Sequence, residues 1–164
     1  MARKNNRMKT EYHRGLGFDP RKYISAPVQR TGYILPDRTP QRGDIWFANL
    51  GTHPNSSVQS GTRPVIIISN DLGNEHADTV NVVPMTRHLK KPELPCHMEL
   101  NPDCITDARQ LLDTSMVLAE QITTIGKNHL FNYVGKIADT TVLHRINAAV
   151  AAQLGIERSN AECL

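Results

Sequence analysis

Residues 61–71 read GTRPVIIISND, and this stretch decides the fold that the sequence predicts. Four consecutive apolar residues, 65–68, follow an arginine and a proline and precede a cluster of turn-forming residues. A short β-branched run bounded in this way is typical of a fully buried β-strand. Arg63 is unusual beside such a run, because a charged side chain is rarely placed next to a core without a partner or a ligand.

Further short strands are expected on both sides of this stretch. Segments rich in β-branched and aromatic residues predict them at residues 44–49 (DIWFAN), 79–86 (TVNVVPMT), 96–100 (CHMEL), 115–121 (SMVLAEQ) and 133–137 (YVGKI). Residues 50–62 are rich in Gly, Ser, Asn and Pro and predict a long loop, which in a compact domain is often functional. Residues 69–78 are expected to form a turn region, and Trp46 and Phe47 to lie in the core.

One helix is expected near the C-terminus, because apolar residues recur there at helical spacing. Asp139 or Thr140 can cap its start, Gly155 can end it in the left-handed conformation, and the apolar positions are Leu143, Ile146, Val150 and Leu154. Several short strands followed by one amphipathic helix predict a mainly β domain, a small coiled sheet or barrel packed by a C-terminal helix.

The 164 residues are enough for one domain with a real core. We expect a basic, irregular N-terminal arm over residues 1–40, the domain over residues 41–156 and a tail over residues 157–164. Residues 1–42 contain ten Lys or Arg against three Asp or Glu, so this segment can attract phosphates; it can equally be a solvated tail. No apolar run is long enough for a membrane helix and no secretory signal is present, so a cytoplasmic protein with reduced cysteines is expected.

The sequence offers no familiar metal or cofactor motif. Cys-x-x-Cys and His-Glu-x-x-His are absent, and Cys96 and His97 with Cys104 do not match a zinc spacing. A phosphate-binding P-loop, a dinucleotide fingerprint and a Gly-x-Ser-x-Gly motif are also absent. We therefore expect no metal and no cofactor.

The candidate catalytic residues stand at strand ends. Arg63 lies where one strand begins and Thr86 lies where the next expected strand in sequence ends. If the two strands are antiparallel neighbours, both residues meet at one edge of the sheet under loop 50–62, and a guanidinium beside a hydroxyl can bind a phosphate. The structural alternative is that Arg63 pairs with a loop carboxylate and Thr86 only closes a turn.

Four ordered segments carry a family resemblance. RGDIWFANLG, GTRPVIIISNDLGN, TVNVVPMT and LAEQITTI resemble, in order and spacing, the successive motifs of the MazF/PemK toxins of type II toxin–antitoxin systems, over roughly residues 41–156. The resemblance implies a small SH3-like or CcdB-like β-barrel with a C-terminal helix that works as a homodimer. It also implies a sequence-selective, metal-independent endoribonuclease that cuts single-stranded RNA and is blocked by a cognate antitoxin protein.

The resemblance also assigns roles to residues. It places the catalytic arginine and threonine at Arg63 and Thr86, and the RNA-binding residues at Ser57, Gln59, Glu120 and Gln121. RNA carries its own nucleophile, the 2′-hydroxyl, so the protein need only align the strand, stabilise charge on the phosphate and protonate the leaving oxygen. The alternative is a binding toxin of the same fold that lacks catalysis, like the gyrase-inhibiting toxins.

Overall fold

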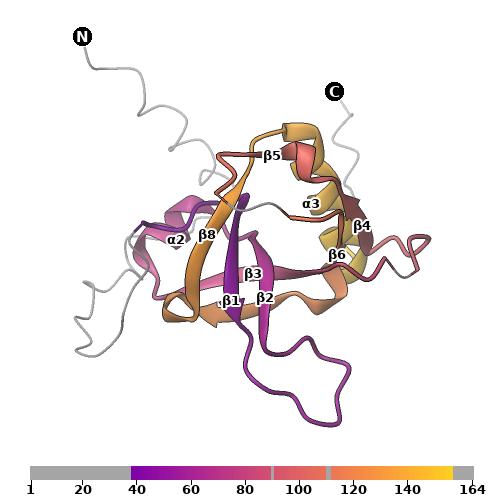
Figure 1. The fold of residues 1–164 in the computed structure, drawn as a ribbon, viewed down its shortest axis with the longest axis horizontal. Helices are drawn as coiled ribbons and strands as arrows, with labels where there is room; N and C mark the ends of the chain where they lie inside the picture. The colour runs from indigo at the N-terminus through magenta and orange to yellow at the C-terminus, as the bar shows by residue number, and fades with distance from the viewer. Residues whose placement is uncertain (1–37, 90, 110–111, 157–164) are drawn as a thin grey trace, which may run out of the picture. The chain divides into compact units, whose positions relative to one another are not determined.

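The computed structural model describes residues 38–89, 91–109 and 112–156. Most of the expected N-terminal arm and the whole expected tail therefore lie outside the described residues. Within them the chain is mainly β, with eight strands in one curled sheet and a helix at the C-terminal end (Figure 1). The predicted fold class is confirmed. None of the helices in these ranges is long and apolar enough to cross a bilayer.

The strand predicted within residues 61–71 is β2, and it lies in the middle of the sheet, as its apolar run predicts. The strand order is β4-β6-β3-β2-β1-β8-β5, with β7 on the edge of β3. The bounds are β1 (Asp44–Asn49), β2 (Thr62–Ile67), β3 (Thr79–Thr86), β4 (His97–Leu100), β5 (Ile105–Thr106), β6 (Ser115–Leu118), β7 (Thr123–Gly126) and β8 (Leu130–Ile137). β2 pairs antiparallel with β1 on one side and with β3 on the other.

β3 changes its second partner along its length, and this change positions the site. Its first half pairs with β7 and its last two residues pair with β6. Pro84, which has no backbone N–H donor, lies at the changeover, where a proline removes a ladder hydrogen bond. The chain between β6 and β7 leaves the sheet there as a 3₁₀ turn, η3 (Ala119–Gln121), so the strand predicted at residues 115–121 ends early. β7 and the short β5 were not predicted.

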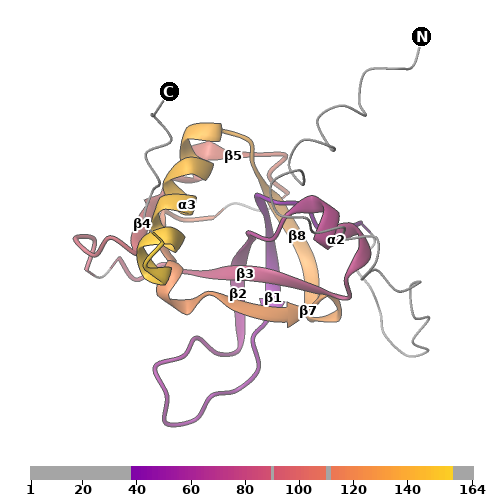
Figure 2. The ribbon, with the colours of Figure 1, turned by 180° about the vertical axis from the view of Figure 1, so that it is seen from behind.

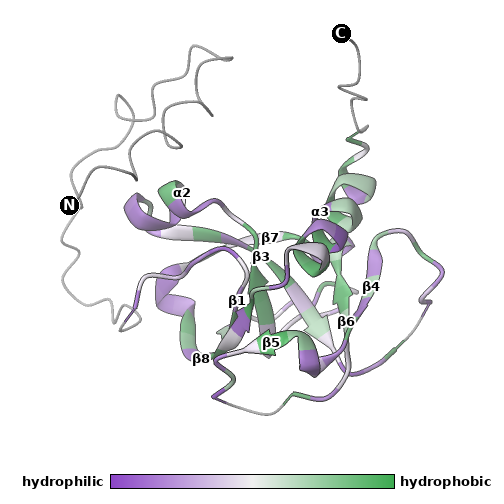
Figure 3. Cartoon of the chain, turned by 90° about the horizontal axis from the view of Figure 1, so that it is seen from above, coloured by the Kyte–Doolittle hydropathy of each residue, from purple (hydrophilic) through white to green (hydrophobic). Residues whose placement is uncertain are grey.

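The core lies on both faces of the sheet, as expected for alternating strand residues. One face buries Ile66 and Val83 with the inner side of the C-terminal helix, and the other buries Val65 and Trp46. Figure 3 shows hydrophobic colour concentrated on the strands. Trp46 is only 1% exposed, which confirms its prediction as a core residue. Phe47 is only half-buried and stacks on the exposed Phe131.

The predicted helix is confirmed as α3 (Thr140–Leu154). The Asp139 side chain accepts a hydrogen bond from the Thr141 N–H at 2.7 Å, and Gly155 ends the helix with φ 64°. α3 packs beside β4 and η3 (Figure 2). The predicted apolar stripe is wrong at Leu154, which is 52% exposed. The buried residues of α3 are Val142, Ile146 and Ala149.

The prediction of turns alone over residues 69–78 is wrong. This segment contains α2 (Asp71–His76), one short helix that follows β2 directly. Its start is fixed by Asn70, whose side chain accepts from the Gly73 N–H at 2.8 Å. The buried Asn74 donates to the Ser69 carbonyl at 3.1 Å, so polar residues that suggest a loop in sequence are here helix-capping groups.

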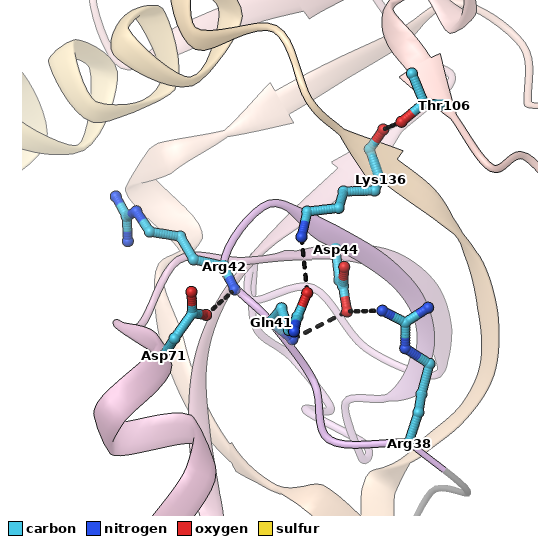
Figure 4. A network of polar contacts seen from close by, with 7 residues as sticks. All are labelled: Arg38, Gln41, Arg42, Asp44, Asp71, Thr106 and Lys136. Carbon is cyan, nitrogen blue, oxygen red and sulfur yellow. Dashed lines mark hydrogen bonds and ion pairs between the residues drawn. The ribbon is translucent and has the colours of Figure 1, made fainter. Parts of the chain in front are cut away.

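A polar network holds the start of β1 at the end of the sheet away from loop 50–62 (Figure 4). Asp44 is fully buried; it accepts from the Gln41 N–H at 2.9 Å and lies 3.4 Å from Arg38. Burial raises the pKa of Asp44, while the Gln41 N–H and the charges of Arg38 and Lys136 oppose that rise. Arg38 also lies over the Tyr133 ring, 4.1 Å from its centroid.

Candidate active site

The register of β2 and β3 determines how Arg63 and Thr86 are related. The two strands are antiparallel and pair Val65 with Pro84. Continued by two residues, this register places Arg63 opposite Thr86 on the same face of the sheet, because side chains repeat every second residue along a strand. The condition set by the sequence, that these strands be antiparallel neighbours, is thus confirmed.

The Arg63 side chain is exposed near the start of β2, at the end of the sheet from which loop 50–62 projects. Its Nη1 donates to the Thr62 carbonyl at 3.0 Å and its Nε to Gln59 Oε1 at 3.5 Å. A guanidinium has five N–H donors, so these two bonds leave three for a ligand. The loop partner is thus an amide rather than the carboxylate that the structural alternative supposed.

Thr86 is half-buried at the last position of β3. Its Oγ1 accepts a hydrogen bond from the His88 N–H at 3.2 Å, so the hydroxyl does close a local turn. Because the backbone N–H occupies only an acceptor position, the hydroxyl proton remains available to donate to a phosphate oxygen. The hydrogen bonds of Arg63 and Thr86 do not join the two side chains to each other.

The loop between β1 and β2 projects from the sheet (Figure 1) and is held at two places. At its base, Leu50 N–H donates to the Gly61 carbonyl at 3.0 Å. Farther out, the Gln121 side chain accepts from the Gln59 N–H at 3.2 Å and donates to the Ser57 carbonyl at 3.5 Å. Three of the four residues predicted to contact RNA are therefore brought together, through the loop backbone and one glutamine.

Glu120, the fourth of these residues, is directed elsewhere. Its Oε1 lies 3.2 Å from His97 Nε2, and its side chain is 28% exposed. Because Glu120 and Gln121 are neighbours in a 3₁₀ turn, their side chains leave the chain in different directions. The Glu-Gln pair is thus divided between the beginning of β4 and the loop.

A cavity of about 280 Å³ lies between the loop and β7. It contains Gln59 and Gln121 of the predicted site, and it adds residues that the sequence analysis missed: His53, Thr123, Thr124 and His129. His129 is the last residue of η4 (Lys127–His129), the turn before β8, and its Nδ1 lies 2.9 Å from the Asn49 carbonyl. This contact joins η4 to the end of β1. Recognising β7 in the sequence would have drawn attention to the two threonines; no sequence signal pointed to the histidines.

These features together define a mainly β protein with one curled sheet, in which an arginine and a hydroxyl lie at neighbouring strand ends and a cavity lies between the loop and β7. A family model described as "PemK-like, MazF-like toxin of type II toxin-antitoxin system" matches residues 41–154. The chain belongs to this family.

Two relatives of the chain are endoribonucleases. The chain is 36% identical over 117 residues to "Endoribonuclease MazF" of Staphylococcus saprophyticus, covering 71% of this chain and 92% of that protein. It is 33% identical over 116 residues to "Endoribonuclease EndoA" of Bacillus subtilis, covering 71% and 95%. The predictions of the family and, at family level, of an endoribonuclease toxin are confirmed.

Solved structures show the same fold. A mycobacterial endoribonuclease superposes with a TM-score of 0.57 at 26% identity, covering 74% of this chain and 96% of that one. A mycobacterial endoribonuclease in complex with its cognate antitoxin gives 0.55 at 28% identity, covering 73% and 98%. The fold of the described domain is thus that of structurally known endoribonucleases.

Proposed function

We propose that this chain is a sequence-selective endoribonuclease toxin that cuts single-stranded RNA without a metal ion, with Arg63 and Thr86 as its catalytic pair. The single observation that carries the proposal is the antiparallel register of β2 and β3, which directs both residues to one sheet edge beside the loop. Family membership supports the same activity.

The reaction uses the 2′-hydroxyl of the RNA as nucleophile. The 2′-hydroxyl gives up its proton to solvent water as its oxygen forms a bond to the adjacent phosphorus. The bond from phosphorus to the 5′-oxygen breaks, and the 5′-oxygen takes up a proton from solvent water. The products are a 2′,3′-cyclic phosphate and a 5′-hydroxyl. The protein's task is to hold the strand in line and to stabilise the charge that develops on the phosphate oxygens.

Arg63 performs the second task. A guanidinium stays protonated in proteins and donates in a planar fork, so it binds two phosphate oxygens and stabilises the leaving oxygen by a hydrogen bond, but it is not a base. Thr86 donates its hydroxyl proton to a phosphate oxygen and so orients the group for in-line attack.

The loop and the cavity select the bases. Single-stranded RNA presents unstacked bases whose edges accept and donate hydrogen bonds, and side-chain amides can do both. Gln59 and Gln121 line the cavity, and the exposed Ser57 lies on the same loop. These three residues read the base next to the cut, and Glu120 is left out of this contact because its side chain is directed to His97.

The partners follow from the same surface. A cognate antitoxin protein covers the sheet edge and loop and blocks RNA, by analogy with the relative solved in complex with its antitoxin. The toxin works as a homodimer in the cytoplasm. Light scattering of the purified protein measures its mass, and a monomer at micromolar concentration would contradict the dimer.

The test is cleavage of a single-stranded RNA by purified protein in EDTA, followed by analysis of the new ends. We expect cleavage at a short sequence motif, with 2′,3′-cyclic phosphate and 5′-hydroxyl ends. A matched double-stranded RNA should remain intact, because its bases are not splayed. Growth arrest in cells without any RNA fragmentation would contradict the proposal and favour a binding toxin of the same fold.

A further inference from the structure

Three side chains that can bind a metal ion meet where β4 begins. The ligand atoms of Cys96, His97 and Glu120 all lie within 4.8 Å of one another. β4 and β6 pair His97 with Leu118, and the Ala119 N–H donates to the Cys96 carbonyl at 3.0 Å. Cys96 belongs to the turn before β4, so strand alternation does not force it to the face opposite its neighbour. The fold therefore brings a turn, a strand end and η3 together.

The orientation of His97 suits a metal ligand. Its side chain is 8% exposed, and its Nδ1 lies 2.9 Å from the Lys91 carbonyl oxygen. A carbonyl only accepts, so Nδ1 is the donor of this hydrogen bond and Nε2 is the ring nitrogen that faces Glu120. Nε2 faces Glu120 Oε1 at 3.2 Å, a separation that fits either the N–H···O bond of an ion pair or a metal ion bound by both atoms. A ligating histidine usually makes this second hydrogen bond to a carbonyl.

Glu120 supplies an independent observation. Its second carboxylate oxygen, Oε2, is buried and has no hydrogen-bond partner among the described residues. A buried carboxylate oxygen left without a partner is costly, and a bound cation removes that cost. The side chain as a whole is 28% exposed, which leaves a path for an ion and for a water molecule.

We propose that Cys96, His97 and Glu120 bind a Zn²⁺ ion. A thiolate, an imidazole and a carboxylate are all zinc ligands, and three protein ligands with a water complete its tetrahedral shell. The sulfur ligand disfavours Mg²⁺ and Ca²⁺, which take oxygen. This ion takes no part in RNA cleavage: it fixes η3, and with it the adjacent Gln121 that holds the loop.

Zinc binding is tested on the untagged full-length chain with Cys104→Ser and Cys163→Ser, so that Cys96 is its only thiol. Calorimetry with zinc chloride, after removal of metal by a chelator, should give one ion per chain. Cys96→Ser and Glu120→Gln should each weaken binding at least about tenfold. His144→Ala, on the exposed side of α3, is the control and should leave binding unchanged.

Two further readouts separate metal ligation from folding. Zn²⁺ at about a hundredfold above its Kd should raise the Tm of the parent chain by on the order of 5 to 10 °C and not that of the Cys96→Ser chain. Co²⁺ should produce the charge-transfer absorption of a cobalt–thiolate bond only when Cys96 is present. Far-UV circular dichroism in EDTA checks that the variants fold.

Equal zinc binding by the parent and the Cys96→Ser chain would overturn the proposal, and so would no binding at all. Either result identifies His97 and Glu120 as an ordinary ion pair with a proton between them. Because no RNA is present in these measurements, their failure leaves the proposed ribonuclease activity untouched.

Discussion

Replacement of Arg63 by alanine removes the guanidinium without disturbing the sheet. The side chain is exposed and its two hydrogen bonds are to Gln59 of the loop and to the neighbouring Thr62 carbonyl, so the free energy of unfolding should change by no more than about 0.5 kcal/mol. Its three remaining N–H donors are those we assign to the phosphate. Loss of one strong transition-state donor costs about a hundredfold to a thousandfold in rate, or about 2.7 to 4 kcal/mol.

Arg63→Lys separates charge from geometry. Lysine restores the positive charge but not the planar fork, so it should recover only part of the lost rate. Arg145→Ala, on the exposed side of α3, removes the same charge elsewhere and should leave the rate unchanged.

The assay is single-turnover cleavage of a fluorescent RNA in EDTA, with binding measured separately by anisotropy. Single-turnover conditions isolate the chemical step from product release. If Arg63→Ala kept more than a third of the parent rate at saturating enzyme, the residue would not stabilise the transition state and the reasoning would fail.

Three further predictions follow from the described contacts. Thr86→Val should lower the cleavage rate at least about tenfold, while Thr86→Ser should retain most of the rate, since only the hydroxyl is needed. Equal cleavage rates for the parent and Thr86→Val would contradict this prediction. The pKa of Asp44 is raised above its ordinary 3.8, so the folded protein binds that proton more tightly than the unfolded chain does. In urea unfolding, the parent should therefore gain stability relative to Asp44→Asn as the pH falls toward 3.8. A stability difference that does not change with pH would contradict this prediction. Removal of residues 1–37 keeps Arg38 on Asp44 and should flatten the salt dependence of RNA binding; an unaltered slope would make the arm a passive tail.

The sequence predicted the strands that carry strong local patterns and missed those that depend on distant partners. The apolar run after Pro64 and the capped helix after Asp139 are legible because neighbouring residues determine them. β7 reads TTIG, without alternation, and exists because β3 offers it an edge. The turn over residues 69–78 was read from polar composition, but Asn70 caps a helix there.

For the candidate site, a strand-end argument anticipates the antiparallel pairing of β2 and β3, on which the proposed roles of Arg63 and Thr86 depend. Sequence spacing does not reveal the cluster at β4, because the next cysteine along the chain, Cys104, is not a member of it. The third member is Glu120, which only the β4–β6 pairing brings beside His97.

In the proposed reaction the RNA attacks its own backbone at a phosphate held by the protein. The most direct measurement uses an RNA in which only the nucleotide before the cut is replaced by its 2′-deoxy form. We predict that this substrate binds with nearly unchanged affinity and is not cut at that bond. Cleavage of the deoxy substrate at the normal position and rate would show that water or a protein group is the nucleophile, and would contradict the account.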